Sequence, residues 1–180
     1  LTGASTIFYE NLAIAKLCKS LWPDVKIIIG GDFASLNFKR ILNDFTEFDF
    51  ACIGDGEILT AELIHYLSKN SKPHHLTSIA GLAWRSDGRN VHFNPVSAIQ
   101  INNFPAPARD DLNRVLEFGF PAAIYTTRGC PFRCSFCTTG QVSALQNGSS
   151  SYRQMSLAKI IDQIENLYNN FSVKNMIIVD

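Results

Sequence analysis

Along the first part of the chain, short and predominantly apolar runs alternate with segments in which apolar residues recur at helical spacing. The apolar runs are residues 26–29 and 50–53, and each is followed by a glycine. The helical segments are residues 9–21, 38–45 and 59–67. Strands without polar alternation, separated by amphipathic helices, predict a parallel sheet covered on both faces.

Each predicted helix has one stripe of apolar residues that the spacing assigns to the core. We also expect Cys18 and Cys52, which lie among apolar neighbours, to be core residues. The stripes consist of Ile14, Leu17, Cys18 and Leu21 in the first helix, Phe38, Ile41, Leu42 and Phe45 in the second, and Leu59, Leu63, Tyr66 and Leu67 in the third.

The pattern changes after these helices. Residues 79–84 and 91–93 flank the pair Asp87-Gly88, which is the strongest short signal for a hairpin turn. Residues 102–110 contain two prolines and no periodicity, which predicts a stiff linker. We therefore expect a first domain over residues 1–100, a linker over 101–111 and a second domain over 112–180.

The second domain is predicted to contain one strand–helix–strand unit. Residues 122–126 form a strand that runs into a cysteine-rich loop, and a polar stretch follows at 143–151. Ser156 then caps a helix, and residues 176–179 form a second strand, parallel to the first. The apolar face of this helix consists of Leu157, Ile160, Ile161, Ile164, Leu167 and Tyr168.

Composition and charge exclude some classes of protein. The 180 residues are 46% hydrophobic, which predicts a folded core. Sixteen basic residues balance sixteen acidic ones, so the net charge gives no reason to expect a nucleic acid as partner. No apolar run is long enough for a membrane span, and we expect a cytoplasmic protein. The chain begins at Leu1 within strand-like sequence, so we expect it to be part of a longer protein.

The loop from Arg128 to Cys137 contains three of the five cysteines, Cys130, Cys134 and Cys137, in the spacing CxxxCxxC. Three thiolates close together suit an iron–sulfur cluster, and three ligands for four irons leave one iron open. The alternative is a structural zinc site. Such a site usually has four ligands in two pairs, and no fourth ligand lies near this loop.

The string TRGCPFRCSFC, residues 127–137, resembles the signature of the radical S-adenosylmethionine (SAM) superfamily, in the form found in its cobalamin-dependent branch. The resemblance implies a partial (β/α) barrel in which SAM chelates the open iron of a 4Fe-4S cluster. Reductive cleavage of SAM then gives a 5'-deoxyadenosyl radical. It also implies that Phe136 lies near the adenine and that Arg153 and Asp180 help to bind the cofactor; an aromatic ring packed inward is the alternative for Phe136.

The first domain is similar to the cobalamin-binding domain, a doubly wound (flavodoxin-like) α/β fold, that precedes the barrel in this branch. Glycines after two successive strands let a large ligand approach the backbone at the carboxyl edge of a sheet. The alternative for each glycine is an ordinary turn. The residues that this resemblance assigns to cobalamin are Gly30, Gly31, Gly54, Asp55, Gly56 and Glu57, with Gly3 and Thr6 near the corrin tail. Relatives commonly have glutamate at position 55.

The resemblance implies an enzyme that carries out cobalamin-dependent methyl transfer or a rearrangement on a small molecule, a lipid or a tetrapyrrole-type compound. Its partner would be an electron donor such as a flavodoxin or ferredoxin, and we expect this chain alone to be inactive. Two alternatives remain. One is a non-catalytic module that binds cobalamin or a metal. The other is a methylthiotransferase, which needs a second cluster for which the first domain offers only Cys18 and Cys52.

Overall fold

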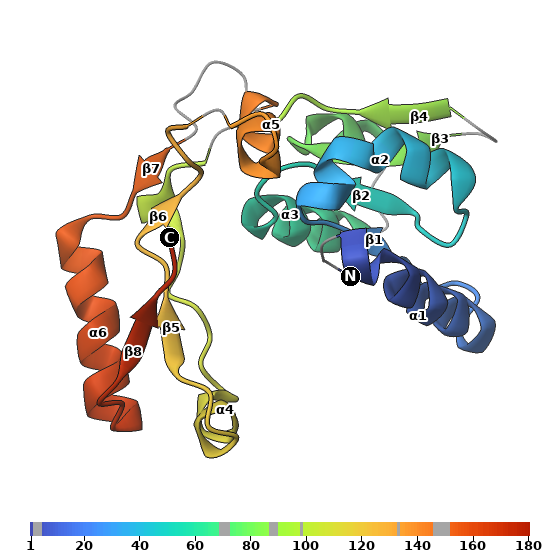
Figure 1. The fold of residues 1–180 in the computed structure, drawn as a ribbon. Helices are drawn as coiled ribbons and strands as arrows, with labels where there is room; N and C mark the ends of the chain where they lie inside the picture. Colours follow the sequence, from blue (N-terminus) through green and yellow to red (C-terminus); the bar gives the residue numbers. More distant parts are fainter. Residues whose placement is uncertain (2–4, 69–72, 87–89, 98, 133, 146–151) are drawn as a thin grey trace. The chain divides into compact units, whose positions relative to one another are not determined.

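The computed structural model describes residues 1, 5–68, 73–86, 90–97, 99–132, 134–145 and 152–180 (Figure 1). The chain divides into two compact units. The first unit comprises Leu1–Ala98 and Phe132–Ser149, and the second comprises Ile99–Pro131 and Ser150–Asp180. The first change of unit, at residue 99, lies close to the expected domain boundary at residue 100, but the chain returns to the first unit at Phe132, inside the cysteine loop.

The first unit contains a four-stranded sheet in the order β1-β2-β3-β4. β1 (Ile28–Ile29) and β2 (Phe50–Cys52) are parallel, with Ile28 opposite Phe50. β3 (Leu82–Ser86) runs antiparallel to β2, and β4 (Asn90–Phe93) runs antiparallel to β3. The predicted hairpin is therefore confirmed, and it extends the parallel pair into one mixed sheet. The pair Asp87-Gly88 lies outside the described residues.

Helices cover both faces of this sheet, as the apolar strands predict. A short 3-10 helix, η1 (Ser5–Ile7), leads into α1 (Phe8–Leu21), and α2 (Asp32–Asp44) joins β1 to β2. α3 (Glu57–Ser68) and the 3-10 helix η2 (Pro73–Ser78) join β2 to β3, and α5 (Thr138–Ala144) packs on α2. α5 was not predicted from the sequence.

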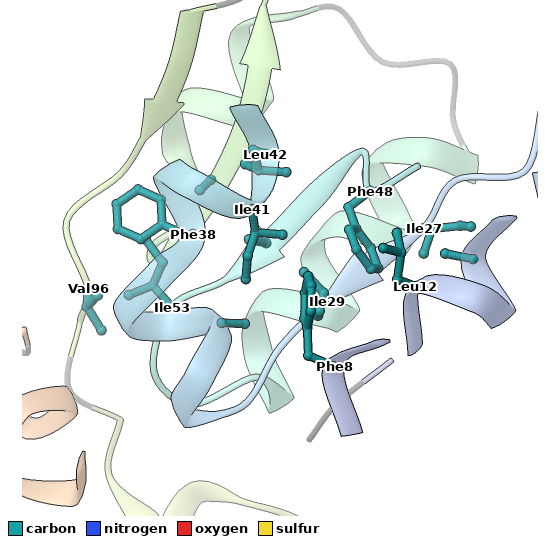
Figure 2. Close-up of a cluster of buried hydrophobic side chains, with 14 residues drawn as sticks. Phe8, Leu12, Ile27, Ile29, Phe38, Ile41, Leu42, Phe48, Ile53 and Val96 are labelled. Atoms are coloured by element: carbon teal, nitrogen blue, oxygen red, sulfur yellow. The ribbon is translucent and has the colours of Figure 1, made fainter. Parts of the chain in front are cut away.

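Two buried clusters fill the two sides of the sheet. On one side, side chains from α1 and α2 pack on Ile29, Ala51 and Ile53 (Figure 2). On the other side, Leu59 and Leu63 of α3 pack on Phe50, Cys52 and Leu82. Strand residues thus alternate between two cores.

The predicted core face of α1 is wrong except at Cys18, which is partly buried and packs against the core. Ile14, Leu17 and Leu21 are 47%, 58% and 57% exposed, and the buried side consists of Phe8, Asn11, Leu12 and Ala15. Both stripes have helical spacing, so the pattern alone could not choose between them. The Phe8 ring lies 5.3 Å from the ring of Phe33 and 5.1 Å from that of Phe45, and this aromatic cluster selects the side that is buried.

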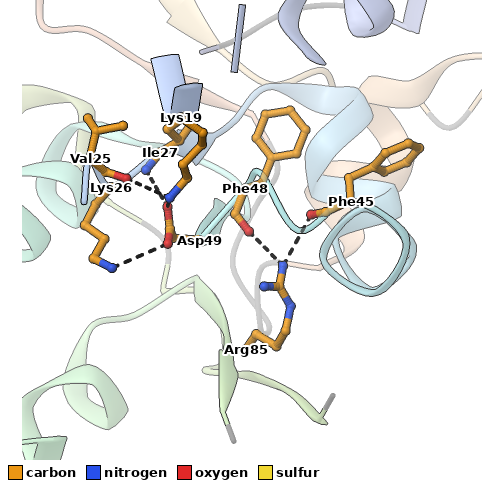
Figure 3. A network of polar contacts seen from close by, with 8 residues as sticks. All are labelled: Lys19, Val25, Lys26, Ile27, Phe45, Phe48, Asp49 and Arg85. Carbon is orange, nitrogen blue, oxygen red and sulfur yellow. Dashed lines mark hydrogen bonds and ion pairs between the residues drawn. The ribbon is translucent and has the colours of Figure 1, made fainter. Parts of the chain in front are cut away.

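Two polar side chains fasten the elements around β2 (Figure 3). The Asp49 carboxylate lies 2.7 Å from Lys19 Nζ and accepts a 2.8 Å hydrogen bond from the Ile27 N–H. Arg85 of β3 donates hydrogen bonds to three backbone carbonyls around the end of α2. These are the carbonyls of Leu42 at 2.8 Å, Phe45 at 3.3 Å and Phe48 at 2.8 Å.

The second unit confirms the predicted strand–helix–strand unit. β5 (Ala122–Ile124) pairs in parallel with β8 (Met176–Ile178), and α6 (Leu157–Phe171) connects them. The Ser156 hydroxyl accepts a hydrogen bond from the Lys159 N–H, so the predicted cap is present. The short strands β6 (Thr127–Arg128) and β7 (Arg153–Gln154) pair antiparallel, which the sequence did not suggest.

The predicted face of α6 is only partly correct. Leu167 is buried and Ile160 and Ile164 pack against the core of the second unit. Leu157, Ile161 and Tyr168 are 70%, 43% and 64% exposed, so these three assignments are wrong. The sheet of β5 and β8 has two strands, so it covers only a narrow stripe of α6, about one residue per turn.

Residues 101–111, expected to be a linker, lie within the second unit and are fastened to it. They include η3 (Ile101–Asn103) and precede α4 (Leu112–Glu117). The Ser156 N–H donates to Asn102 Oδ1 at 2.8 Å, and Lys159 Nζ donates to the Phe104 carbonyl at 2.8 Å. Within the described ranges, no helix is long and apolar enough to cross a membrane.

Candidate cofactor-binding site

The cysteine loop follows β5 and β6, as the sequence predicts. Gly129, which has φ 78°, turns the chain at the end of β6 immediately before Cys130. Only glycine adopts this backbone conformation without strain. Cys130 falls in the second unit, whereas Cys134 and Cys137 fall in the first.

Cys137 lies directly before α5 in a position that favours its thiolate. The Cys137 N–H donates to the Cys134 carbonyl at 3.1 Å and closes a turn between the two cysteines. A hydrogen bond from the Thr139 hydroxyl, together with the backbone N–H groups of Thr139 and Gly140, lowers the pKa of the Cys137 thiol. A lowered pKa suits a metal ligand, because the thiolate is the binding form.

The donor set of the loop fits an iron–sulfur cluster in its chemistry, since it offers three thiols, none of them in a disulfide. Cys134 is exposed, and Cys130 and Cys137 are partly exposed. In the described part of the chain, no three His, Cys, Asp or Glu side chains are gathered as they would be around a metal ion. Joint ligation by the three cysteines therefore stays a prediction.

Asp180 follows β8 and is bound to the segment that precedes the cysteine loop. Its carboxylate accepts hydrogen bonds from the N–H groups of Thr126 at 2.8 Å and Thr127 at 2.9 Å, and from the Thr126 hydroxyl. Desolvation raises the pKa of the Asp180 carboxyl, but these hydrogen bonds outweigh it and bring the pKa below its ordinary value of 3.8. The structure thus gives Asp180 protein partners; its predicted contact with a cofactor stays a prediction.

The other two residues that the resemblance assigns to SAM lie in different surroundings. Arg153 is partly buried in β7, and its guanidinium donates to the Ile99 carbonyl at 3.0 Å. Phe136 is 88% exposed, which excludes the alternative of a ring packed inward. An exposed ring beside the cysteines is free to stack on a planar ligand.

The glycines of the first unit lie where the parallel strands end. Gly30 and Gly31 follow β1, and Gly31, with φ 92° and ψ 175°, caps α2. Gly54 follows β2 and has φ 81°. The predicted residues of both loops therefore share the carboxyl edge of β1 and β2, at the start of α2 and α3, where open α/β sheets bind ligands. We call residues 30–31 and 54–57 the glycine edge.

Cys52 forms the floor of the glycine edge. A Cβ atom added to Gly30 would lie 3.4 Å from Cys52 Cβ, and one added to Gly56 would lie 3.4 Å from Cys52 Sγ. Packing against Cys52 is therefore a second explanation for glycine at positions 30 and 56, besides the approach of a ligand. Burial, with the nearby charges of Glu57 and Asp55, raises the pKa of the Cys52 thiol to about 12, so Cys52 is a neutral core residue as expected.

The glycine edge also carries negative charge. Glu57 is the first residue of α3, where the helix dipole favours a carboxylate, and Asp55 is partly exposed beside it. Thr6, assigned to the corrin tail, is exposed in η1. Gly3, assigned to the same tail, lies outside the described residues.

Sequence reasoning missed Ser35, a polar residue of α2 that is only 1% exposed. Its hydroxyl donates to the Gly31 carbonyl at 2.9 Å and accepts a hydrogen bond from the Gly54 N–H at 3.0 Å. The sequence offered one signal for the first of these bonds: Ser35 lies four residues after Gly31, the spacing at which a serine in a helix can donate to an earlier carbonyl. The contact with Gly54, nineteen residues later in the chain, has no signal in a single sequence.

No family model matches the chain. The chain is 27% identical over 184 residues to the uncharacterized methyltransferase PH0819 of Pyrococcus horikoshii, covering 100% of this chain and 38% of the relative. It is 29% identical over 119 residues to the anaerobic magnesium-protoporphyrin IX monomethyl ester cyclase of a Synechocystis species, covering 64% and 23%. It is 24% identical over 181 residues to the cobalamin-dependent radical SAM methyltransferase TokK of Streptomyces tokunonensis, covering 96% and 25%.

Solved structures share the fold. The cobalamin-dependent SAM radical enzyme OxsB, with aqua-cobalamin and SAM bound, matches 97% of this chain with a TM-score of 0.77 and 20% identity. The radical SAM methyltransferase TsrM of Kitasatospora setae matches 94% with a TM-score of 0.69 and 21% identity. The match covers 24% of the OxsB chain and 32% of the TsrM chain. The predicted α/β fold class is thereby confirmed.

The chain spans less than two fifths of the length of each curated relative named above. Within that span, the cysteine string lies after β5 and β6 and the glycine edge at the ends of β1 and β2. The sequence matches and the shared fold lead to the same group of proteins. The chain is accordingly similar in sequence and in fold to cobalamin-dependent radical SAM enzymes, the group that the cysteine string predicted.

Proposed function

We propose that this chain provides the cofactor-binding part of a cobalamin-dependent radical SAM methyltransferase. The observation that carries the proposal is the CxxxCxxC loop directly after β6, in a chain whose relatives include a cobalamin-dependent radical SAM methyltransferase. Cys130, Cys134 and Cys137 would hold a 4Fe-4S cluster, and the glycine edge would hold cobalamin. When bound, these groups and SAM supply the radical and methyl-transfer chemistry.

The residues of the chain have distinct tasks in this proposal. The cysteine thiolates bind iron, and the hydrogen bonds to Cys137 from Thr139 and Gly140 stabilise one of them in its binding form. Phe136, an exposed ring next to Cys137, would stack on the adenine of SAM. Arg153 and Asp180 would line the same cofactor site, and the negative charge of Asp55 and Glu57 would meet the donor groups of the corrin side chains.

Other partners of the whole protein follow from the same proposal. A small flavodoxin-like or ferredoxin-like protein would deliver the electron, and the reducing cytoplasm suits a chain whose described cysteines form no disulfide. The substrate would be a small molecule, a lipid or a tetrapyrrole-type compound.

A second function, ring closure on a tetrapyrrole, has support from three relatives that are named as magnesium-protoporphyrin IX monomethyl ester cyclases, those of Synechocystis, Cereibacter sphaeroides and Rubrivivax gelatinosus. The two cyclases that match 99% of the chain are 24% and 22% identical to it, whereas the methyltransferase PH0819 is 27% identical over all of it, and three further relatives are named as methyltransferases or a methylase. We therefore favour methyl transfer. Mass analysis of products formed from methyl-labelled SAM separates the two, because only methyl transfer adds the label to the substrate.

Cluster binding is tested by anaerobic reconstitution of the chain with iron and sulfide. We expect about four irons per chain, with broad visible absorption and an EPR signal after reduction that SAM perturbs. Replacing Cys130, Cys134 or Cys137 singly with alanine should abolish stable iron binding.

Cys18→Ala and Cys52→Ala are the matched controls, since both thiols lie outside the loop, and their iron content should stay unchanged. Equal loss of iron in all five variants would contradict the assignment. Stoichiometric zinc without iron uptake would favour the non-catalytic module, and a second cluster would favour a methylthiotransferase.

A further inference from the structure

We propose that Ser35 is a positioning residue that holds the two loops of the glycine edge at a fixed distance and so determines how this edge binds its ligand. The inference rests on the proposed cobalamin site, and it assigns a task to a residue outside that predicted site. Ser35 is one of the two polar residues that are buried in the described part of the chain.

The parallel pairing of β1 and β2 stops before the glycine edge begins. β1 and β2 pair through Ile28 with Phe50 and Ile29 with Ala51. After these pairs the strands end, and the loops that follow leave the sheet at Gly31 and Gly54, both with positive φ. The strand pairing therefore does not set the distance between the loops.

The Ser35 hydroxyl supplies the missing connection. It donates to the Gly31 carbonyl at 2.9 Å in the first loop and accepts from the Gly54 N–H at 3.0 Å in the second. A single oxygen atom thus links both loops. Since the side chain is almost completely buried, water does not compete for these bonds.

A role within α2 alone would explain only one of the two hydrogen bonds of Ser35. Serine in a helix commonly donates to the carbonyl four residues earlier, as Ser35 does to Gly31. The second hydrogen bond crosses from α2 to the loop after β2 and does nothing for the helix. If the hydroxyl were removed, the Gly54 N–H would lose this partner, and the loop would have to shift to regain one.

The test compares Ser35→Ala with wild-type protein in two measurements. The first is amide hydrogen exchange at Gly54 in the ligand-free chain, which should become at least tenfold faster. The second is titration with hydroxocobalamin, whose affinity should fall at least tenfold at a temperature where thermal unfolding shows both proteins to be folded. Ser35→Cys, whose sulfur forms weaker hydrogen bonds, should give an exchange rate and an affinity between those of wild type and of Ser35→Ala.

Ser20→Ala is the matched control, because the Ser20 hydroxyl also donates to a carbonyl of its own helix, that of Leu17 at 2.8 Å, but is exposed. It should change neither measurement. If Ser35→Ala and Ser35→Cys bind hydroxocobalamin as tightly as wild type, the role of Ser35 is overturned while the proposed site stands. If wild-type protein takes up the iron–sulfur cluster but no hydroxocobalamin, the proposed cobalamin site is overturned, and the role of Ser35 with it.

Discussion

At the scale of single residues, polar side chains join segments that are far apart in the sequence. Asp180 binds the backbone of Thr126 and Thr127, more than fifty residues earlier, and Ser35 binds Gly54. Resemblance to a family assigned Asp180 to a cofactor, and its carboxylate in this chain holds the strand end that leads towards Cys130.

The hydrogen bonds of Asp180 predict a particular dependence on pH. A depressed carboxyl pKa stabilises the folded state above the ordinary value of 3.8, and this contribution is lost as the pH falls through the lowered pKa. In an NMR titration, the amide signals of Thr126 and Thr127 should therefore shift with a midpoint below 3.8. Asp180→Asn should remove this shift.

Asp162→Asn serves as the control, because Asp162 is an exposed carboxylate on α6 of the same unit. Its removal should leave the titration of the two threonine amides unchanged. A midpoint above 3.8 in wild-type protein would contradict the hydrogen bonding of Asp180.

At the scale of elements, the sequence pattern predicted which helices and strands form but not which side of a helix is buried. α1 has two apolar stripes with the same spacing, and contacts with aromatic side chains from other segments decide between them. β6 and β7, each of two residues, are too short to show any periodicity. The predicted strand from Ile79 begins only at Leu82, because Gly81, with φ 73°, turns the chain just before it.

Arg85 connects three elements, and its loss should destabilise the first unit. Arg85→Met keeps the apolar part of the side chain and removes the hydrogen bonds to the Leu42, Phe45 and Phe48 carbonyls. Hydrogen bonds to a charged group contribute about 1.5–3 kcal/mol, so we expect the free energy of unfolding to fall by about 2 kcal/mol. Urea unfolding followed by tryptophan fluorescence measures this change.

Arg40→Met is the matched control. Arg40 is exposed and pairs with Asp44 at 3.4 Å within α2, an arrangement that contributes about 0.5 kcal/mol or less. Equal destabilisation by the two substitutions would show that the three carbonyl contacts of Arg85 add nothing to stability.

At the scale of the whole molecule, the two units have separate cores of different size. The second unit has one buried cluster, made of Leu112, Ala122, Ile124, Leu167 and Val173, whereas the first unit has two larger ones. Because less buried apolar area gives less stability, we expect the second unit to unfold at a lower urea concentration.

The two tryptophans make this difference measurable, since Trp22 and Trp84 both lie in the first unit. Circular dichroism should lose part of its helical signal, that of α6, before tryptophan fluorescence changes. Coincident transitions would instead indicate that the chain unfolds as one cooperative body.

The assignment of chain segments to the two units was the part of the architecture that was hardest to predict from the sequence. Composition located the change near residue 100, because prolines and loss of periodicity are local signals. The return of residues 132–149 to the first unit depends on contacts between α5 and α2, about a hundred residues apart, and leaves no local signal. The same limit explains why the cysteine string stands out in the sequence, whereas the contacts around it do not.

This interleaved order of segments has a consequence during synthesis on the ribosome. The first unit receives its last helix, α5, only after β5 and β6 of the second unit have been made. The second unit cannot pair β5 until β8, at residues 176–178, has emerged. The first unit therefore cannot finish folding before α5 has been translated, nor the second before β8, and until then β5 lacks its partner strand.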